Sequence, residues 1–211
     1  MMRIVLGGVR GTSPVSHSDF LRYGGATTSL LVDDGKRTRG VIDAGTGLHA
    51  LQPHLAAADA DSPPLFLFTH YHLDHAFGNS EFVKLGAVVI AQENDKKSME
   101  KSAVDTLKNI GEYGLTQQDM KGTKPAYPAL AYGDRMTIDI GGQQIELIHA
   151  RYSHTTGDTL VYLPDKKVLF AGGCFRCMRY RRTVAAARCS TDITSGSITS
   201  SRLWRGRVSG R

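Results

Sequence analysis

The chain has 211 residues, of which 41% are hydrophobic and 22% charged, so it is long enough for one domain with a substantial core. No run approaches the roughly 20 apolar residues of a membrane span, and the N-terminal apolar run is too short for a secretory signal, so we expect a cytoplasmic protein with no membrane partner. The net charge of +6 is unevenly spread, because residues 1–174 carry 17 Lys and Arg against 19 Asp and Glu, whereas residues 175–211 carry nine arginines and one acid.

Strand and helix patterns alternate along the first 171 residues. Short apolar or alternating runs predict strands over residues 3–7, 28–33, 39–43, 65–69, 87–91, 136–140, 143–149, 159–163 and 167–171. Helices are expected over residues 46–58, 79–85 and 92–110. Pro53 should kink or shorten the first, and the third is polar and should be largely exposed. This order predicts an α/β fold, an αββα sandwich with helices outside two packed sheets.

Two short segments and one long one connect the later elements. Gly141-Gly142 and Pro164-Asp165-Lys166 each predict a tight turn between two strands. Residues 111–133 contain Pro125, Pro128 and several glycines and predict a long loop.

A cluster of metal-ligand residues follows the apolar run at 64–68. Residues 69–75 read Thr-His-Tyr-His-Leu-Asp-His, which places His70, His72, Asp74 and His75 just after a buried strand. Imidazole nitrogen and carboxylate oxygen are the ligands that a catalytic zinc prefers. Four such side chains this close together are hard to explain as core or solvated surface. The sequence therefore predicts a metal site.

The same segment, T-H-x-H-x-D-H, resembles the signature of the metallo-β-lactamase superfamily. Other segments are similar to that family in the same order: residues 42–47 resemble its strand ending in D-x-G, residues 153–158 its third motif, and residues 160–172 the strands that lead to its fourth. The resemblance covers roughly residues 1–173. It implies a sandwich of the metallo-β-lactamase type with an incomplete or divergent C-terminal part.

The resemblance also implies roles for individual residues. His70, His72 and His154 would hold one zinc with a water in the open position, and Asp74 and His75 would point to a second metal. Asp74 would be the catalytic residue, which orients the nucleophile and shuttles its proton.

Two further segments take their expected roles from the same resemblance. Asp43 would fix a ligand histidine by hydrogen bonding, or it would cap the turn that follows it. Insertions such as residues 111–133 often border the active site in this superfamily, so this loop is a candidate lid that contacts substrate.

The chain departs from the family pattern after residue 172. The family places a metal-bridging aspartate, or in one β-lactamase subclass a cysteine, at a position that corresponds to Gly173 when counted from His154. Cys174 comes one residue late and would need a bulge to reach the metal. No histidine follows His154, so the family's last histidine ligand is missing. We therefore expect one firmly bound zinc, a second that is weak or absent, and weak catalysis.

The other candidate ligands have simpler explanations. We interpret His17, His49, His54 and His149 as packing or surface residues. Cys174 and Cys177 form a C-x-x-C pair, a weak signal for zinc or redox chemistry because only a lone third cysteine, Cys189, is present.

The charge and composition divide the chain into a metallo-β-lactamase-like domain at residues 1–174 and a basic tail at 175–211. The tail is rich in Arg and Ser and shows no strand or helix pattern. We expect a disordered or foreign extension. The alternative is a segment that binds nucleic acid or another anionic surface.

Together these features predict a zinc-dependent hydrolase whose hydroxide attacks a carbonyl (lactam, lactone or thioester) or a phosphate ester. The substrate stays open, because residues 10–14 and 22–29 resemble the phosphodiesterase branch, whereas residues 76–94 and the chain from there to Phe170 resemble broader β-lactamase-like hydrolases. Two alternatives remain. One is a catalytically impaired module that binds one zinc, and the other is a phosphodiesterase-like protein that processes RNA.

Overall fold

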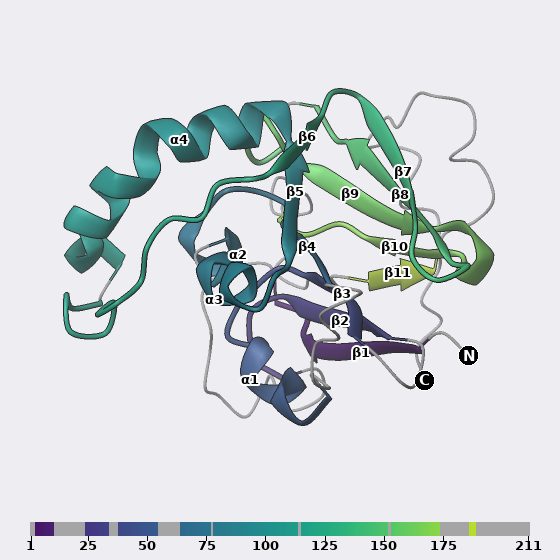
Figure 1. The fold of residues 1–211 in the computed structure, drawn as a ribbon, viewed down its shortest axis with the longest axis horizontal. Coiled ribbons are helices and arrows are strands. Elements are labelled where there is room, and N and C mark those ends of the chain that lie inside the picture. The colour runs from purple at the N-terminus through teal and green to yellow at the C-terminus, as the bar shows by residue number, and fades with distance from the viewer. Residues whose placement is uncertain are drawn as a thin grey trace, which may run out of the picture.

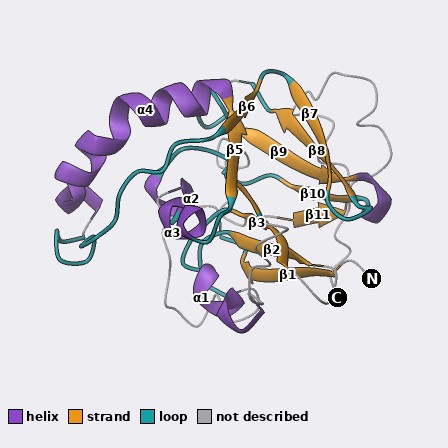
Figure 2. Ribbon diagram, in the orientation of Figure 1, coloured by secondary structure: helices purple, strands orange, loops and turns teal. Residues whose placement is uncertain are grey.

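The computed structural model describes residues 3–10, 24–33, 38–54, 64–76, 78–113, 115–151, 153–173 and 186–188. Their strands form two sheets, and the helices lie to one side of the strands (Figure 1). In the view of Figure 2, the helices α1 to α4 occupy the left of the molecule, and the strands of the second sheet occupy the right. Among the described residues, no helix is both long and apolar enough to cross a bilayer.

The first sheet has six strands in chain order. They are β1 (Arg3–Gly8), β2 (Ser29–Asp33), β3 (Thr38–Ile42), β4 (Leu65–Leu67), β5 (Val88–Gln92) and β6 (Leu130–Tyr132). The strands β1 to β3 pair antiparallel, whereas β3 to β6 pair parallel. Parallel pairing brings the C-terminal ends of β3, β4 and β5 to one edge, which is where open α/β sheets usually place their sites.

The second sheet has five antiparallel strands in the order β11-β10-β9-β8-β7. They are β7 (Arg135–Asp139), β8 (Gln144–His149), β9 (Thr159–Leu163), β10 (Val168–Phe170) and β11 (Ala186–Arg188). The predicted turn between β7 and β8 is confirmed: Gly141 and Gly142 have φ of 63° and 84°, a conformation that favours glycine. The turn between β9 and β10 is the short 3-10 helix η4 (Pro164–Lys166).

Alternate residues of the first sheet belong to two different apolar clusters. In β2, Leu31 packs in one cluster while Leu30 and Val32 pack in the other. In β4, Phe66 and Leu67 divide in the same way. The first cluster includes helical residues, and the second includes residues of the second sheet. The first sheet is therefore buried on both faces, with helices on one side and the other sheet on the other.

The helices of the first layer are short except for α4. They are α1 (Leu48–Leu51), α2 (Leu73–Ala76), α3 (Asn79–Lys84) and α4 (Glu93–Lys108), with the 3-10 turns η2 (Gln52–His54) and η3 (Ile110–Tyr113). In α4 only Asp95, Met99 and Ala103 are buried, a single line at four-residue spacing. The prediction of a largely exposed helix is confirmed.

The second sheet carries a further apolar cluster on the face turned away from the first. It consists of Ile148, Leu160, Leu169 and Ala171. In an αββα sandwich this is the face that the second helix layer covers. The described part of the chain includes no α-helix on this face, so the αββα architecture is seen in three of its four layers.

All nine predicted strands are present, each with bounds within two residues of the prediction. The helix predicted at 46–58 is α-helical only over Leu48–Leu51, and a 3-10 turn containing Pro53 follows, so the prediction that Pro53 shortens it is confirmed. Residues 55–58 lie outside the described residues. The prediction of a loop over residues 111–133 is wrong at its C-terminal end, because residues 130–132 form the strand β6. Three residues at an exposed sheet edge are too few to show a pattern.

Two other elements were not predicted. Residues 73–76 form α2, so Asp74 and His75 lie on a helical turn instead of an extended loop. Residues 186–188 form β11, which pairs with β10, within the tail predicted to lack strands. The rest of the tail lies outside the described residues, and its proposed disorder and its binding of nucleic acid stay predictions.

Candidate metal centre

The predicted metal ligands come from two segments that are far apart in the sequence. His70, His72, Asp74 and His75 follow β4, and His154 lies in the loop between β8 and β9. The two segments meet because the Thr159 amide donates a hydrogen bond of 2.8 Å to the Thr69 carbonyl, which joins the start of β9 to the end of β4. The packing of the two sheets therefore builds the site.

Three imidazoles form the first group of candidate ligands. One nitrogen each from His70, His72 and His154 lies within 4.8 Å of the others. His72 Nδ1 and His154 Nε2 are 3.1 Å apart, whereas two nitrogens on a tetrahedral zinc would lie roughly 3.3 Å apart at zinc–nitrogen distances of about 2.0 Å. The His70 ring stands at 84° to His72 and at 82° to His154, so His70 stacks on neither ring. The group fits a three-histidine metal site.

The second group shares one histidine with the first. It consists of His70, Asp74 and His75, again with ligand atoms within 4.8 Å of one another. His75 is fully buried, and its Nε2 makes no hydrogen bond to any described residue, although Asp74 Oδ2 lies 3.5 Å away. A buried nitrogen without a hydrogen bond is costly unless a ligand satisfies it, which favours a bound cation. Because one imidazole nitrogen binds a single ion, the shared His70 completes one group at a time and leaves two ligands for a second ion.

Asp43 holds the buried side of this site. Its carboxylate accepts hydrogen bonds from the Thr69 amide (2.7 Å) and the Thr69 hydroxyl (2.9 Å), and Oδ2 lies 2.7 Å from His75 Nδ1. All three residues are buried. The contact with Nδ1 leaves Nε2 of His75 to face the metal position. Of the two roles considered for Asp43, the structure shows the one that fixes a ligand histidine.

The electrostatics of the site differ from one ligand to the next. Burial disfavours the charged form of His75, but the carboxylates of Asp43 and Asp74 outweigh it and raise the pKa of His75 to about 10. Burial, assisted by the neighbouring His154, lowers the pKa of His72. Burial alone would raise the pKa of Asp74, but the neighbouring His75 imidazole, whose Nε2 lies 3.5 Å from Asp74 Oδ2, outweighs it and lowers that pKa. Asp74 is therefore ionised and His72 neutral at neutral pH, as metal ligands must be. In the absence of a metal His75 carries a proton at neutral pH, which an ion bound at Nε2 would have to displace.

The loop that carries His154 is held by buried and half-buried side chains. The Asp158 carboxylate accepts hydrogen bonds from the backbone amides of His154 and Thr155. The Thr156 carbonyl accepts from Asn94 Nδ2 and contacts His149 Nε2, each at 2.9 Å. His149 therefore supports the ligand loop and is not itself grouped with the ligands, as the sequence predicted.

Asp95 connects the two ligand-bearing segments from the first turn of α4. It is fully buried, its Oδ1 accepts from Thr155 Oγ1 at 3.3 Å, and the Tyr71 backbone hydrogen-bonds to its carboxyl group. Gly157 lies so close that a Cβ there would come within 2.4 Å of the Asp95 amide nitrogen. Burial, together with the charge of Asp158, raises the pKa of Asp95 to about 8. Nothing in the sequence distinguished Asp95 from the other acids of this polar helix.

The end of β10 closes the site from the second sheet. Gly172 has φ of 49°, and a Cβ there would lie 2.1 Å from Thr69 Oγ1, so only glycine fits. A Cβ on Gly173 would lie 2.9 Å from His70 Cε1 and 3.0 Å from His154 Cδ2. A side chain at position 173 would therefore point between two candidate ligands, but glycine contributes none.

The remaining candidates are placed as follows. His49 and His54 are exposed on α1 and η2. His17 and the three cysteines, Cys174, Cys177 and Cys189, lie outside the described residues, so the role considered for Cys174 stays a prediction.

The loop at 115–129 runs beside α4, where Gln117 donates to the carbonyls of Leu107 and Lys108. Its expected role as a lid also stays a prediction.

Comparison with known proteins assigns the family. The model of the metallo-β-lactamase superfamily matches residues 22–172, well over half of the chain. The chain belongs to the metallo-β-lactamase superfamily. A metallo-β-lactamase from Pontibacter korlensis has the same fold, with a TM-score of 0.53 and 19% identity over 80% of this chain and 71% of that one.

Two relatives have similar sequences over part of their length. The alpha subunit of 2,4-dinitroanisole O-demethylase from Nocardioides sp. (strain JS1661) is 26% identical over 57% of this chain and 31% of that protein. The acyl-coenzyme A thioesterase MBLAC2 from Gallus gallus is 24% identical over 63% of this chain and 52% of that protein. The chain thus spans about a third and about half of the length of these relatives.

We predict that Asp43→Asn weakens metal binding. The amide would present a donor as well as an acceptor to Thr69 and His75, which disturbs the orientation of His75, and loss of such a supporting contact typically costs about 10- to 100-fold in metal affinity. The zinc dissociation constant, measured by competition with a chelator, checks this. Asp139→Asn, at an exposed carboxylate near the turn after β7, is the control and should bind zinc as the wild type does.

We predict that Asp95→Asn stabilises the protein increasingly as the pH rises from 4 to 8. The folded chain keeps the Asp95 proton up to about pH 8, whereas the unfolded chain loses it near the ordinary value of 3.8, so the wild type loses stability across this window. The difference in unfolding free energy should change by at most about 1.4 kcal/mol per pH unit in urea titrations. A constant difference, like that expected for the exposed Asp105→Asn, would contradict this.

We predict that Gly173→Asp raises the metal content per chain. The new carboxylate would project between His70 and His154, where the ligand set is short of an oxygen donor. Elemental analysis after zinc loading is the measurement. Gly173→Ala is the matched control, because it brings the same Cβ without a carboxylate and should bind no more zinc than the wild type. Equal metal content in the two variants would count against this position as a ligand site.

Proposed function

We propose that this protein is a zinc-dependent hydrolase that cleaves an activated carbonyl compound, with a thioester as its preferred substrate. The observation that carries the proposal is the convergence of His70, His72 and His154 beside the carboxylate of Asp74. Three imidazoles with an open fourth position are a catalytic ligand set, whereas structural zinc sites are closed by four protein ligands. The thioesterase named among the relatives supports the choice of bond.

The ligand set accounts for the chemistry required. A zinc ion held by these histidines would lower the pKa of its water to about 7 and polarise the carbonyl oxygen of the substrate. Asp74 is ionised, and its side chain is 36% exposed, so it can accept a proton from the attacking water at its carboxylate oxygen. The same carboxyl group can then donate that proton to the departing thiolate. His75, fixed by Asp43, holds Asp74 from the buried side.

A carbonyl fits this site better than a phosphodiester. Phosphodiester cleavage commonly uses two ions that clamp the attacking and the leaving oxygen. Here His70 is common to both candidate groups, and Gly173 offers no bridging ligand. A single ion is sufficient to attack a planar carbonyl. The same observation favours a second candidate function, a module that binds one zinc without turnover.

The experiment compares the zinc-loaded wild type with Asp74→Asn on S-acetyl-N-acetylcysteamine, with Asp139→Asn as an exposed control. We expect the wild type to hydrolyse the thioester and to lose activity when a chelator removes the metal. Asp74→Asn should lower kcat by about 10²- to 10⁴-fold, the usual contribution of a positioned acid–base group, while one zinc per chain is retained. One zinc per chain in a wild type that hydrolyses no ester, thioester or lactam would support the second candidate instead.

A further inference from the structure

One hydroxyl group lies between two buried carboxyl groups next to His154. Asp95 belongs to the first turn of α4 and Asp158 directly precedes β9, and neither has any exposed surface. The Thr155 hydroxyl oxygen lies 3.3 Å from Asp95 Oδ1 and 3.0 Å from Asp158 Oδ1. Because a hydroxyl group carries a single proton, Thr155 can donate to only one of the two carboxyl groups at a time.

The hydrogen bonds favour Asp158 as the acceptor of that proton. Asp158 Oδ2 accepts from the backbone amides of His154 and Thr155, the latter at 2.6 Å. Its Oδ1 is also the nearer of the two carboxyl oxygens to the Thr155 hydroxyl. Three donors compensate a buried carboxylate for the water that it has lost on folding. Thr155 therefore donates to Asp158.

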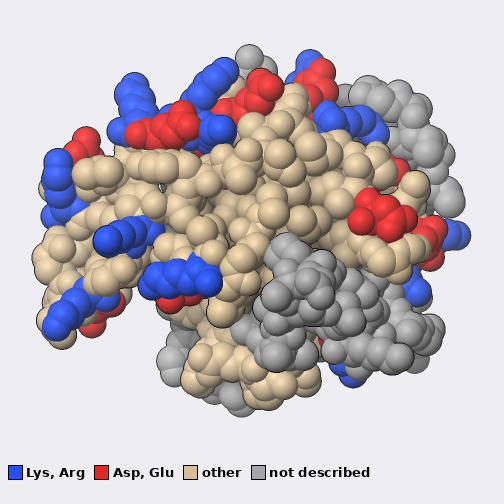
Figure 3. All heavy atoms as spheres, in the orientation of Figure 1, with Lys and Arg blue, Asp and Glu red and all other residues tan. Residues whose placement is uncertain are grey.

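Asp95 has fewer donors and more repulsion. The Tyr71 backbone hydrogen-bonds to its carboxyl group, but Oδ2 makes no hydrogen bond to any described residue. Burial, followed by the negative charge of Asp158, raises the pKa of Asp95 to about 8. Asp95 is thus a neutral acid at neutral pH. The exposed acids of the same helix differ, because they belong to the charges of both signs that Figure 3 shows along this edge of the molecule: Glu93, Glu100 and Asp105.

A proton on Asp95 Oδ1 completes a hydrogen-bond network of Asp95, Thr155 and Asp158. Asp95 then donates to Thr155 Oγ1, and Thr155 donates to Asp158 Oδ1. The Thr155 oxygen also accepts from the Gly157 amide at 3.2 Å, so both of its lone pairs are used. The remaining Oδ2 of Asp95 is an uncharged carbonyl oxygen, which costs less to bury without a partner than a charged one.

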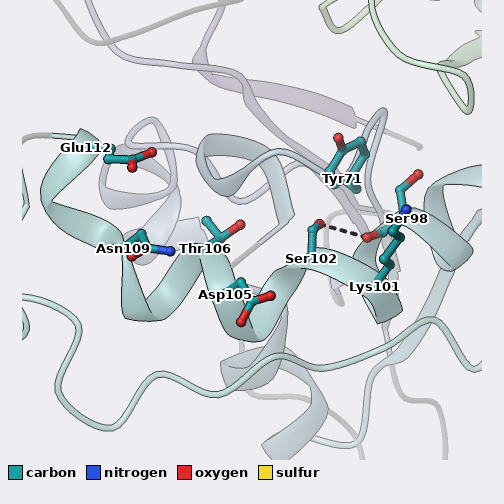
Figure 4. Close-up of a pocket in the computed structure, with 8 residues that line it drawn as sticks. All are labelled: Tyr71, Ser98, Lys101, Ser102, Asp105, Thr106, Asn109 and Glu112. Atoms are coloured by element: carbon teal, nitrogen blue, oxygen red, sulfur yellow. Dashed lines mark hydrogen bonds between the residues drawn. The ribbon is translucent and has the colours of Figure 1, made fainter.

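The network contacts both segments that carry candidate ligands. At one end Asp158 holds the amide of His154. At the other end Asp95 bonds to the backbone of Tyr71, the residue before His72. Figure 4 shows the Tyr71 side chain beside α4, and Tyr71 packs against the core cluster that includes Met99 of this helix. The first half of α4 therefore fixes the two ligand segments against each other.

We propose that Asp95, as a neutral acid, positions the metal ligand His154 through the hydroxyl of Thr155. The proposal rests on the zinc binding of the proposed function and is independent of the bond that is cleaved. Loss of one member of the network would displace His154 without removing a ligand. A lost supporting contact of this kind typically costs about 10- to 100-fold in metal affinity.

Two substitutions of Thr155 test the hydroxyl at the centre of the network. Valine has nearly the same shape without the hydroxyl, whereas serine keeps it. We expect Thr155→Val to weaken zinc binding about 10- to 100-fold in chelator competition and Thr155→Ser to bind as the wild type does. The visible spectrum of the cobalt-substituted protein reports the arrangement of the ligands, so it should change in the valine variant only. Thr156→Val makes the same change at an exposed neighbour and is the matched control.

The proton on Asp95 is tested in the metal-free protein. The infrared spectrum of the wild type at neutral pH should contain the carbonyl band of a protonated carboxylic acid, and Asp95→Asn should lack it. The amide of Asp95→Asn can donate to Thr155 in the same way, so this variant should keep the wild-type zinc affinity. Asp95→Leu should resemble Thr155→Val. The two combined should cost no more than either alone, because both break the same network.

The Thr155 variants and Asp95→Asn carry the test if Asp95→Leu does not fold. An unchanged zinc affinity and cobalt spectrum in Thr155→Val would overturn the proposal, as would the absence of a carboxylic acid band that depends on Asp95. If both measurements support the network but the zinc-loaded protein cleaves no ester, thioester or lactam, the proposed reaction alone is refuted.

Discussion

The buried carboxylate of Asp43 connects the core strands to the candidate metal site through its hydrogen bonds. It follows β3 with φ of 61°, a left-handed conformation that aspartate tolerates better than most residues. From there it binds the backbone and the side chain of Thr69 at the end of β4, as well as Nδ1 of His75. A buried charge is stable only with such partners, so the ends of two parallel strands and one candidate ligand are fixed together. Asp43 thus has this uncommon backbone conformation at the position from which its carboxylate reaches Thr69 and His75.

Much of this arrangement could be predicted from the sequence. The strands of the core are short apolar runs, which can be recognised in the sequence. Alternate residues face opposite sides of the sheet, as Leu31 in β2 and Phe66 in β4 show. The ligands after β4 are contiguous, so their grouping follows from local order. His154 could be added only through resemblance to a family, because no local pattern shows that a loop 80 residues later meets the first one.

What could not be predicted depends on tertiary contacts. Asp95 is one acid among several on a polar helix, and only the packing of Gly157 against it reveals that it is buried between both ligand segments. The strands β6 and β11 have three residues each and owe their existence to neighbours that offer free edges.

The superfamily fold positions the ligands, whereas the details of this chain set what they can do. Three imidazoles beside an ionised aspartate form a group that could hold one ion. The glycine at position 173 offers no ligand to the second group, so the reaction we propose uses a single metal.

We propose that histidines from two distant segments bind one zinc together. The most direct measurement is the zinc dissociation constant of the wild type and of His154→Ala, determined by chelator competition. We expect one tightly bound zinc in the wild type and an affinity lower by more than about 100-fold in the variant, since a ligand itself contributes more than the supporting contacts around it. A wild type that stays free of metal after zinc loading, or a variant that binds zinc as tightly as the wild type, would contradict it.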